Sequence, residues 1–376
     1  CRFRRTRQHY RGNLRRLYPG HGRSGHYIFP RAHVGMADLV FHVSYYSVDT
    51  AQRPDGREDI MTMPNWKVIF VILALAGIVL YPVFQTNTYI MHIMILFFIW
   101  ASVASNWNLL MGVAGITSLG NIGFLAVGGY ASGILAKQFG WSPWGCMILG
   151  GIFAMIIVTL LVGLPALRLS GIYIALLSLI FADSLPTILT QTRSITGGAM
   201  GLHDIPPFFP DITRIQAYYI VFCFFLCIHG VIYWITRSST GLAFVAMRDS
   251  KEFAAALGVN EYKEKIKVFA MVSFMTGLSG GFYVHYLGDI SPTTLAIEPF
   301  LLGIAMMEMG GIGTFMGPIL GSALIVFGNE FLRMAGTLRL AVLGGMICAT
   351  ILFFPGGIIQ LVDWIDEKIA WVKNRR

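Results

Sequence analysis

Few side chains in the long apolar stretches of this sequence could take part in chemistry, and Asp183 is the clearest of them. It lies in the middle of IYIALLSLIFADSLPTIL, three residues before Pro186. A carboxylate in apolar surroundings costs roughly 2.5–3.5 kcal/mol. We therefore expect Asp183 to face the interior of a helix bundle or a wet cavity, or to be protonated. A structural hydrogen bond and a role in moving a solute both fit this position.

A second polar group comprises Asn106, Asn108, Ser118 and Asn121, which lie in and between two neighbouring apolar segments. Amide and hydroxyl groups can bond either the protein backbone or a polar solute. The spacing of these residues does not distinguish the two roles.

Residues for bond chemistry or for holding a metal are not grouped in this sequence. His92, His229 and His285 occur singly in separate apolar segments. The sequence has no nucleophile elbow, no HExxH and no Walker A motif, and Gly311-x-Gly313 is not followed by GK[ST]. We predict no metal and no cofactor, and any ATP-binding machinery must lie on another polypeptide.

The cysteines predict no disulfide framework, because four of the five lie inside apolar segments. Cys223 and Cys227 are four residues apart and so would share one face of a helix. A metal or redox pair fits this spacing, but buried free thiols acting as small hydrophobic groups are the more ordinary interpretation.

The elements that must position these residues are membrane-spanning helices. Of the 376 residues, 55% are hydrophobic and 12% are charged, with a mean hydropathy of +0.65. Soluble domains contain about 25% charged residues. A chain this apolar cannot cover a surface that faces water, so we predict an all-α, polytopic transmembrane helix bundle.

About ten segments approach the roughly 20 apolar residues that cross a bilayer. The third is rich in glycine, and the eighth is short with Glu298 and Glu308 near its ends. Either could be a half-helix or a re-entrant segment. The ten segments lie near 66–84, 89–111, 115–136, 143–164, 171–190, 216–236, 267–287, 297–309, 313–332 and 338–361.

Lysine and arginine predict the orientation, because short cytoplasmic loops are enriched in them. The loop 237–267 and the carboxyl-terminal tail carry most of the basic residues after residue 60. Ten spans place this loop and both termini in the cytoplasm.

Residues 1–60 stand apart, with 11 arginines and no apolar segment. A basic arm for nucleic acid or anionic lipid and a lipoprotein amino-terminus are two interpretations. We favour a third, translation upstream of a true start at Met61 or Met63, with 61–376 as the transmembrane domain. We assign no function to residues 1–60.

The loop 237–267 is the largest polar segment between spans. We predict a short helix that Asp249 or Ser250 caps, that has Glu252 in its first turn and that ends at Gly258. Its alanines would let it rest in a groove of another protein. An ordinary amphipathic loop helix is the alternative.

Two glycine-rich stretches, 112–133 and 309–328, are far apart in the sequence. Gly129 and Gly133 are four residues apart, as are Gly317 and Gly321. Small residues at this spacing let helices pack closely in membranes. The alternative is that the stretches break helices and line a path.

Six blocks, in the same order along the chain, resemble bacterial branched-chain amino-acid ABC transporter permeases, the M-type subunit more than the H-type. Asn121 stands where histidine is common in that family and Asp183 where glutamate is common, and these departures bear on the substrate. The blocks are NLLMGVAGITSLGNIGFLAVGGYASG, GLPALRLSGIYIALLSLIFAD, ITGGAMGL, STGLAFVAMRDSKEFAAALGVNEYKEKIKVFAMVSFMTGLSGGFY, GGIGTFMGPILGSALI and FFPGGI.

The resemblance implies an importer of the bacterial plasma membrane. Its partners would be a second, H-type permease subunit, two cytoplasmic ATPases and an extracytoplasmic substrate-binding protein. The helix in 237–267 would dock on an ATPase, with Glu252, Ala255 and Gly258 as the coupling residues. We expect Asn108, Ser118, Asn121 and Asp183 to line the translocation path.

Branched-chain amino acids are the family's usual substrate, and relatives carry urea or short amides. An ion-coupled secondary transporter is the alternative function, and it would need acids in several spans. A membrane enzyme would need polar groups clustered at one depth. We expect no nucleic acid as a partner.

Overall fold

The computed structural model describes residues 77, 79, 81–82, 87–209, 213–336, 338–353 and 356–359. The predictions for residues 1–60, and for most of the first span at 66–84, lie outside this part of the chain. Within it the structure is helical, and pairing between extended segments is limited to an isolated bridge from Leu202 to Ile290. The all-α prediction is confirmed.

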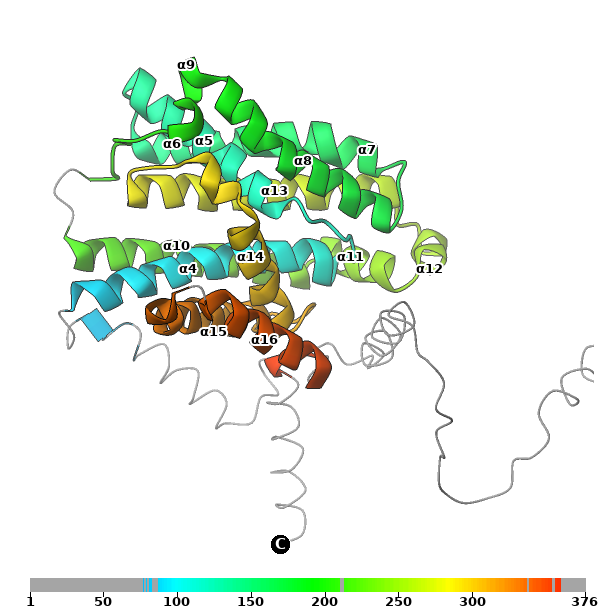
Figure 1. Ribbon diagram of the computed structural model, residues 1–376. Coiled ribbons are helices and arrows are strands. Elements are labelled where there is room, and N and C mark those ends of the chain that lie inside the picture. The colour runs from blue at the N-terminus through cyan, green and yellow to red at the C-terminus, as the bar shows by residue number, and fades with distance from the viewer. Residues whose placement is uncertain are drawn as a thin grey trace, which may run out of the picture. The chain divides into compact units, whose positions relative to one another are not determined.

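The helices follow one another through short connections (Figure 1). Two of them continue through a π-helical turn: α4 into η2, and α6 through η3 into α7. In chain order the elements are α4 (Thr88–Asn108), η2 (Leu109–Val113), α5 (Asn121–Phe139), α6 (Pro143–Val158), η3 (Thr159–Gly163), α7 (Leu164–Ala166), α8 (Ile172–Gln191), α9 (Arg193–Thr196), η4 (Gly198–Met200), α10 (Arg214–Arg237), α11 (Ser239–Asp249), α12 (Lys251–Ala256), α13 (Glu261–Leu287), η5 (Pro292–Leu295), α14 (Ile297–Gly310), α15 (Gly317–Phe331), η6 (Leu332–Ala335) and α16 (Leu338–Phe353).

Five continuous helical stretches in the described residues are long and apolar enough to cross a membrane. They are Thr88–Val113, Pro143–Ala166, Ile172–Gln191, Arg214–Arg237 and Glu261–Leu287. The protein is therefore a polytopic membrane protein. The seventh expected span lies within α13, which Asn260 caps and which begins six residues before 267.

The two spans flagged as unusual differ from each other. The third is an unbroken helix, α5, of 19 residues. The eighth, α14, has 14 residues, which is about 21 Å at 1.5 Å per residue and less than the roughly 30 Å of a bilayer core. In Figure 1, α14 runs at a steep angle to α4 and α13, and it packs on α15 and α4.

Glycine determines how the central helices meet, and the packing interpretation is confirmed. Helices α5, α6 and α13 contact one another along their lengths. A Cβ on Gly128 would overlap the backbone of Gly277, and one on Gly280 would overlap the carbonyl oxygen of Leu125. A Cβ on Gly321 would likewise overlap the carbonyl oxygen of Met306 and separate α15 from α14. These helices therefore pack backbone against backbone.

Candidate functional site

The segment after α10 forms two helices joined at Ser250. The Ser250 hydroxyl accepts a hydrogen bond from the backbone N–H of Phe253 at 3.2 Å and so caps α12. Gly258 is left-handed, with φ of +81°, and Val259 N–H bonds the Ala254 carbonyl oxygen at 3.0 Å. This pattern is a Schellman end. The predicted cap, first turn and end of this helix are confirmed, but the sequence analysis missed α11.

Two large apolar side chains project from the α12 segment, beside the predicted coupling residues, which are all small or acidic. Phe253 is 62% exposed and Leu257 is 63% exposed, and both belong to one face of the short helix. Glu252, Ala255 and Gly258 are exposed beside them. Their combination with a polar surrounding is typical of a protein-binding surface. The i, i+4 spacing of Phe253 and Leu257 was the available sequence signal.

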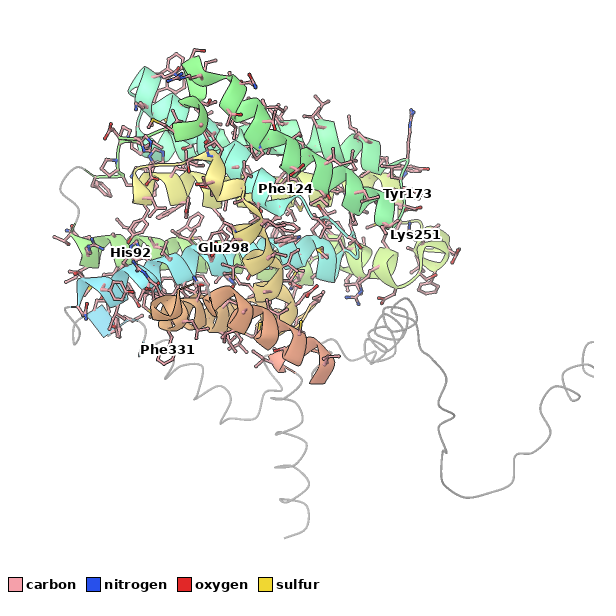
Figure 2. All side chains as sticks on the ribbon, viewed as in Figure 1. His92, Phe124, Tyr173, Lys251, Glu298 and Phe331 are labelled. Carbon is pink, nitrogen blue, oxygen red and sulfur yellow. The ribbon has the colours of Figure 1, made fainter. Side chains whose placement is uncertain are left out.

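An ion pair between Lys251 and Glu261 fastens α12 to the start of α13. Glu261 accepts from Lys251 at 2.9 Å and from Lys265 at 2.8 Å, so one carboxylate joins the two helices. Lys251 lies at the end of the bundle where α12 projects, far from His92 at the other end (Figure 2). Helix α12 therefore has a defined position at that end.

Helix α11 is held to the bundle by apolar packing. Phe244 and Met247 are buried in a core that includes Leu109 and Val113 of η2. At its last turn, Arg248 Nη1 donates to the Gly112 carbonyl oxygen at 2.9 Å. Helix α11 is thus joined to the end of α4 by apolar packing and by this hydrogen bond.

Asn108 joins two segments that are about 200 residues apart in the sequence. Its Oδ1 accepts from Gly313 N–H at 2.7 Å, and its Nδ2 donates to the Thr314 carbonyl oxygen at 2.8 Å. Both atoms that could bond a solute are used by the loop between α14 and α15.

Asn121 and Ser118 are also buried between helices. Asn121 Nδ2 donates to Val103 O at 3.3 Å, and its Oδ1 accepts from the Thr276 hydroxyl at 3.2 Å. Ser118 is fully buried, and its carbonyl oxygen accepts from the indole N–H of Trp107 at 2.7 Å. Its hydroxyl has no partner among the described residues. Both residues are therefore buried between helices of this chain.

Of the three expectations for Asp183, the first is not met within this chain, because its side chain does not face the interior of the chain's own helix bundle. Residues Ile174, Ala175, Ser178 and Ala182 form the buried face of α8, and Asp183 belongs to the opposite, exposed face. The helical rotation of 100° per residue separates Asp183 from its buried neighbour Ala182. The exposed face also carries Ile172, Leu176, Ile180 and Thr187. The four predicted path residues therefore do not gather at one site.

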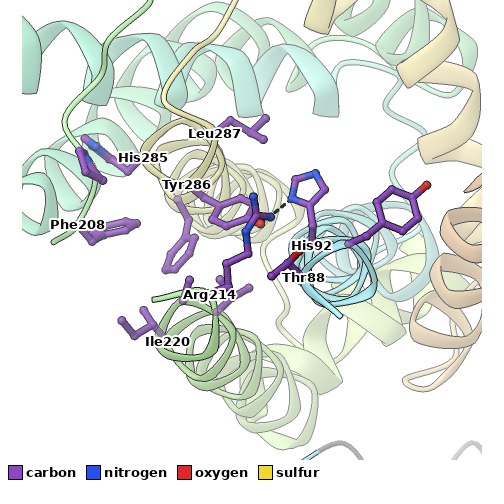
Figure 3. A pocket seen from close by; sticks show the side chains of 13 residues that line it. Thr88, His92, Phe208, Arg214, Ile220, His285, Tyr286 and Leu287 are labelled. Atoms are coloured by element: carbon purple, nitrogen blue, oxygen red, sulfur yellow. Dashed lines mark hydrogen bonds between the residues drawn. The ribbon is translucent and has the colours of Figure 1, made fainter. Parts of the chain in front are cut away.

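A cavity of about 540 Å³ lies at the other end of α4, where α10 begins and α13 ends (Figure 3). His92 Nδ1 and the Tyr286 hydroxyl are 2.6 Å apart at its wall, and Arg214 lies beside them. Phe208 and Phe282 supply an apolar side. The His285 ring forms hydrogen bonds with the Ser132 hydroxyl at 2.9 Å and with the Pro206 carbonyl oxygen at 2.7 Å, so its orientation is fixed. No three His, Cys, Asp or Glu side chains in the described residues gather as a metal site.

Comparison with known proteins covers most of the chain. A family model described as a permease component of the branched-chain amino acid transport system matches residues 89–351. The high-affinity branched-chain amino acid transport system permease protein LivM of Escherichia coli (strain K12) is 25% identical over 320 residues, which are 78% of this chain and 75% of that protein.

The protein of the same name from Salmonella typhimurium is 25% identical over 281 residues, 68% of this chain and 66% of that protein. No solved structure matches the chain. The matched region includes α4 through most of α16, and hence both ends of the bundle described above.

Proposed function

Because this chain belongs to the family of permease components of branched-chain amino-acid transport systems, we propose that it imports branched-chain or related amino acids across the bacterial plasma membrane. It is the permease subunit of an ABC importer. It carries out no bond chemistry itself, and its task is to bind solute differently in its inward-open and outward-open states. We place the permease domain at residues 61–376.

The partners that we propose are an H-type permease subunit, two cytoplasmic ATPases and an extracytoplasmic substrate-binding protein. The observation that carries this proposal is the exposed, capped helix α12. It presents Phe253 and Leu257 beside Glu252, Ala255 and Gly258. Large apolar side chains on a polar helix become favourable when a partner covers them. We place this end of the bundle in the cytoplasm and the ATPase on this surface.

The proposed translocation path follows the exposed face of α8. A carboxylate facing hydrocarbon is costly, so the face that carries Asp183 meets water or the second permease subunit rather than lipid alone. The Ser118 hydroxyl, which has no partner within the described part of the chain, is buried where an ordered water could bond it. Asn108 and Asn121 are engaged with the protein itself, and their contribution is to hold the helices that border the path.

The docking assignment is tested with Gly258→Asp in the assembled importer. A Cβ at Gly258 meets nothing within 4 Å, and aspartate tolerates a left-handed backbone better than most residues. We expect normal membrane insertion and an ATP-driven uptake reduced by at least about tenfold, since the buried charge opposes docking by a few kcal/mol.

Gly140→Asp is the matched control, because Gly140 is also left-handed and open but ends α5. Uptake by Gly258→Asp equal to that of the control contradicts the docking assignment. Uptake that survives ATP depletion but collapses with an ionophore would instead establish the ion-coupled alternative.

A further inference from the structure

Arg248 connects the docking end of the molecule to the transmembrane helices. It lies in the last turn of α11, two residues before the cap of α12. Its Nε donates to Asp249 at 2.9 Å, and its Nη1 donates to the Gly112 carbonyl oxygen at 2.9 Å. Gly112 lies 136 residues earlier in the chain, so one side chain bridges two distant segments.

The end of α4 is built to receive this arginine. Helix α4 loosens into the π-helical turn η2, where Ala114 N–H bonds the Leu109 carbonyl oxygen at 3.1 Å. Carbonyl groups in the last turn of a helix lack partners within the helix. They also lie at the negative end of the helix dipole, where a cation is favourable. Arg248 supplies both a donor and a positive charge there.

One turn earlier in α4, Asn108 extends the connection to the loop between α14 and α15. It holds this loop by two hydrogen bonds, from Gly313 N–H and to the Thr314 carbonyl oxygen. The Thr314 hydroxyl in turn donates to Gly311 O at 2.8 Å and accepts from Gly317 N–H, the first residue of α15, at 3.1 Å. The loop therefore cannot shift relative to α4 without breaking these bonds.

Glycines bring the three segments into direct contact. A Cβ on Gly112 would overlap both Asn108 and Gly313, and one on Gly313 would lie 3.6 Å from Arg248 Nη1. Gly115 has φ of +67°, and a Cβ there would be 2.5 Å from Arg248 Cγ. Close-packed groups such as these transmit displacement rather than absorb it.

We propose that Arg248 is a positioning residue that transmits a displacement of α12, by way of Gly112 and Asn108, to the loop 311–316 and so to α14 and α15. The proposal rests on the proposed function, in which an ATPase docks on α12. Helix α11 is a short rigid lever, because Phe244 and Met247 anchor its buried face. Movement of α14, which is too short to cross the bilayer alone, would then change access to the path.

The test uses the full importer in proteoliposomes, with leucine uptake and ATP hydrolysis measured together. Arg248→Met keeps most of the apolar stem of the side chain and removes the Nε and Nη1 donors. We expect the ATPases to co-purify as in the wild type and the ATP consumed per leucine imported to rise about tenfold, as for loss of a charged hydrogen bond. Asp249→Asn is the matched control, because it removes the ion pair but leaves the bond to Gly112, and its ratio should match the wild type.

Two further variants separate a positioning role from a merely structural one. Arg248→Lys keeps one donor within reach of Gly112 and should restore the ratio to within about threefold of the wild type. Asn108→Ala should raise the ratio as Arg248→Met does, and the double variant should add little, because the two residues lie in one chain of contacts. A wild-type ratio in Arg248→Met, or fully additive effects, overturns the proposal.

The outcomes also distinguish this proposal from the docking assignment. If Gly258→Asp leaves uptake intact while Arg248→Met uncouples it, the assignment of α12 fails and the connection through Arg248 stands. If Gly258→Asp abolishes uptake while Arg248→Met keeps the wild-type ratio, docking stands and the connection fails. Loss of ATPase co-purification in Arg248→Met would make Arg248 part of the docking surface and also overturn the proposal.

Discussion

Helices α13 and α8 are both long enough to cross the membrane, yet they occupy opposite kinds of surroundings. In the most apolar stretch of α13, 72% of the residues are buried within the chain, against 28% for α8. The mean hydropathy runs the other way, at 1.2 for α13 and 1.9 for α8. The less apolar helix is therefore the more buried one.

The reason is that apolar side chains on the outside of the bundle are stable in contact with lipid, whereas in contact with water they are not. Helix α13 uses Gly277, Gly280 and Gly281 to approach α5 and α6 closely. Helix α8 turns Ile172, Leu176 and Ile180 outward. In this protein, close packing between helices comes from small residues, and high hydropathy marks the exposed surface.

Asp183 is a charged exception among the apolar side chains on the exposed face of α8. It lies on the same outward face of α8 as Ile180, although a purely lipid-facing surface would exclude a carboxylate. Our proposal is that this face of α8 meets water or the second permease subunit, whereas α13 serves the packing of its own chain. Three substitutions test this difference between α8 and α13.

The largest effect is expected for Gly280→Leu on α13. A side chain there must displace the Leu125 carbonyl oxygen on α5, so we expect a loss of about 3 kcal/mol or more of stability. Gly230→Leu on α10 is the control, since a Cβ at Gly230 meets nothing within 4 Å. Thermal unfolding of both variants in detergent checks the prediction. Equal melting temperatures would mean that α13 is not tightly packed.

An intermediate effect is expected for Asp183→Leu on α8. The substitution should leave the fold of the chain intact, because the side chain is exposed. We expect uptake to fall about tenfold if the face serves the path, the cost of removing one favourable polar contact with solute or water. Ile180→Leu, on the same face, should leave uptake unchanged. Unaltered uptake in Asp183→Leu would place this face in lipid alone.

The smallest effect is expected for Glu261→Gln at the start of α13. Its carboxylate is one-third exposed and joins Lys251 to Lys265, so the stability should change by only about 0.2–1 kcal/mol. Faster hydrogen exchange confined to α12 would show that the rigidity of α13 reaches α12 through this residue. Lys267→Gln, which breaks the separate pair with Glu264, serves as the control. Exchange that is equally fast in both variants would contradict this role.

Features that depend on neighbours along the chain can be predicted from the sequence. The spans follow from runs of apolar residues, because a bilayer requires them whatever the tertiary contacts. The cap at Ser250 and the end at Gly258 follow from local hydrogen bonding and from the freedom of glycine to adopt positive φ. The family likewise follows from six blocks of residues in one order.

Which polar residues bond other parts of the chain, and which remain available to bond a solute or water, depends on the tertiary structure. Asn108 bonds a loop 205 residues away, and Arg248 bonds a carbonyl 136 residues away. Asp183 faces outward because of how α8 rests on α5. Such contacts depend on the angles and rotations at which helices meet, and glycine contacts between distant segments set these in the folded chain. These contacts cannot be predicted from the spacing of the same residues along the sequence.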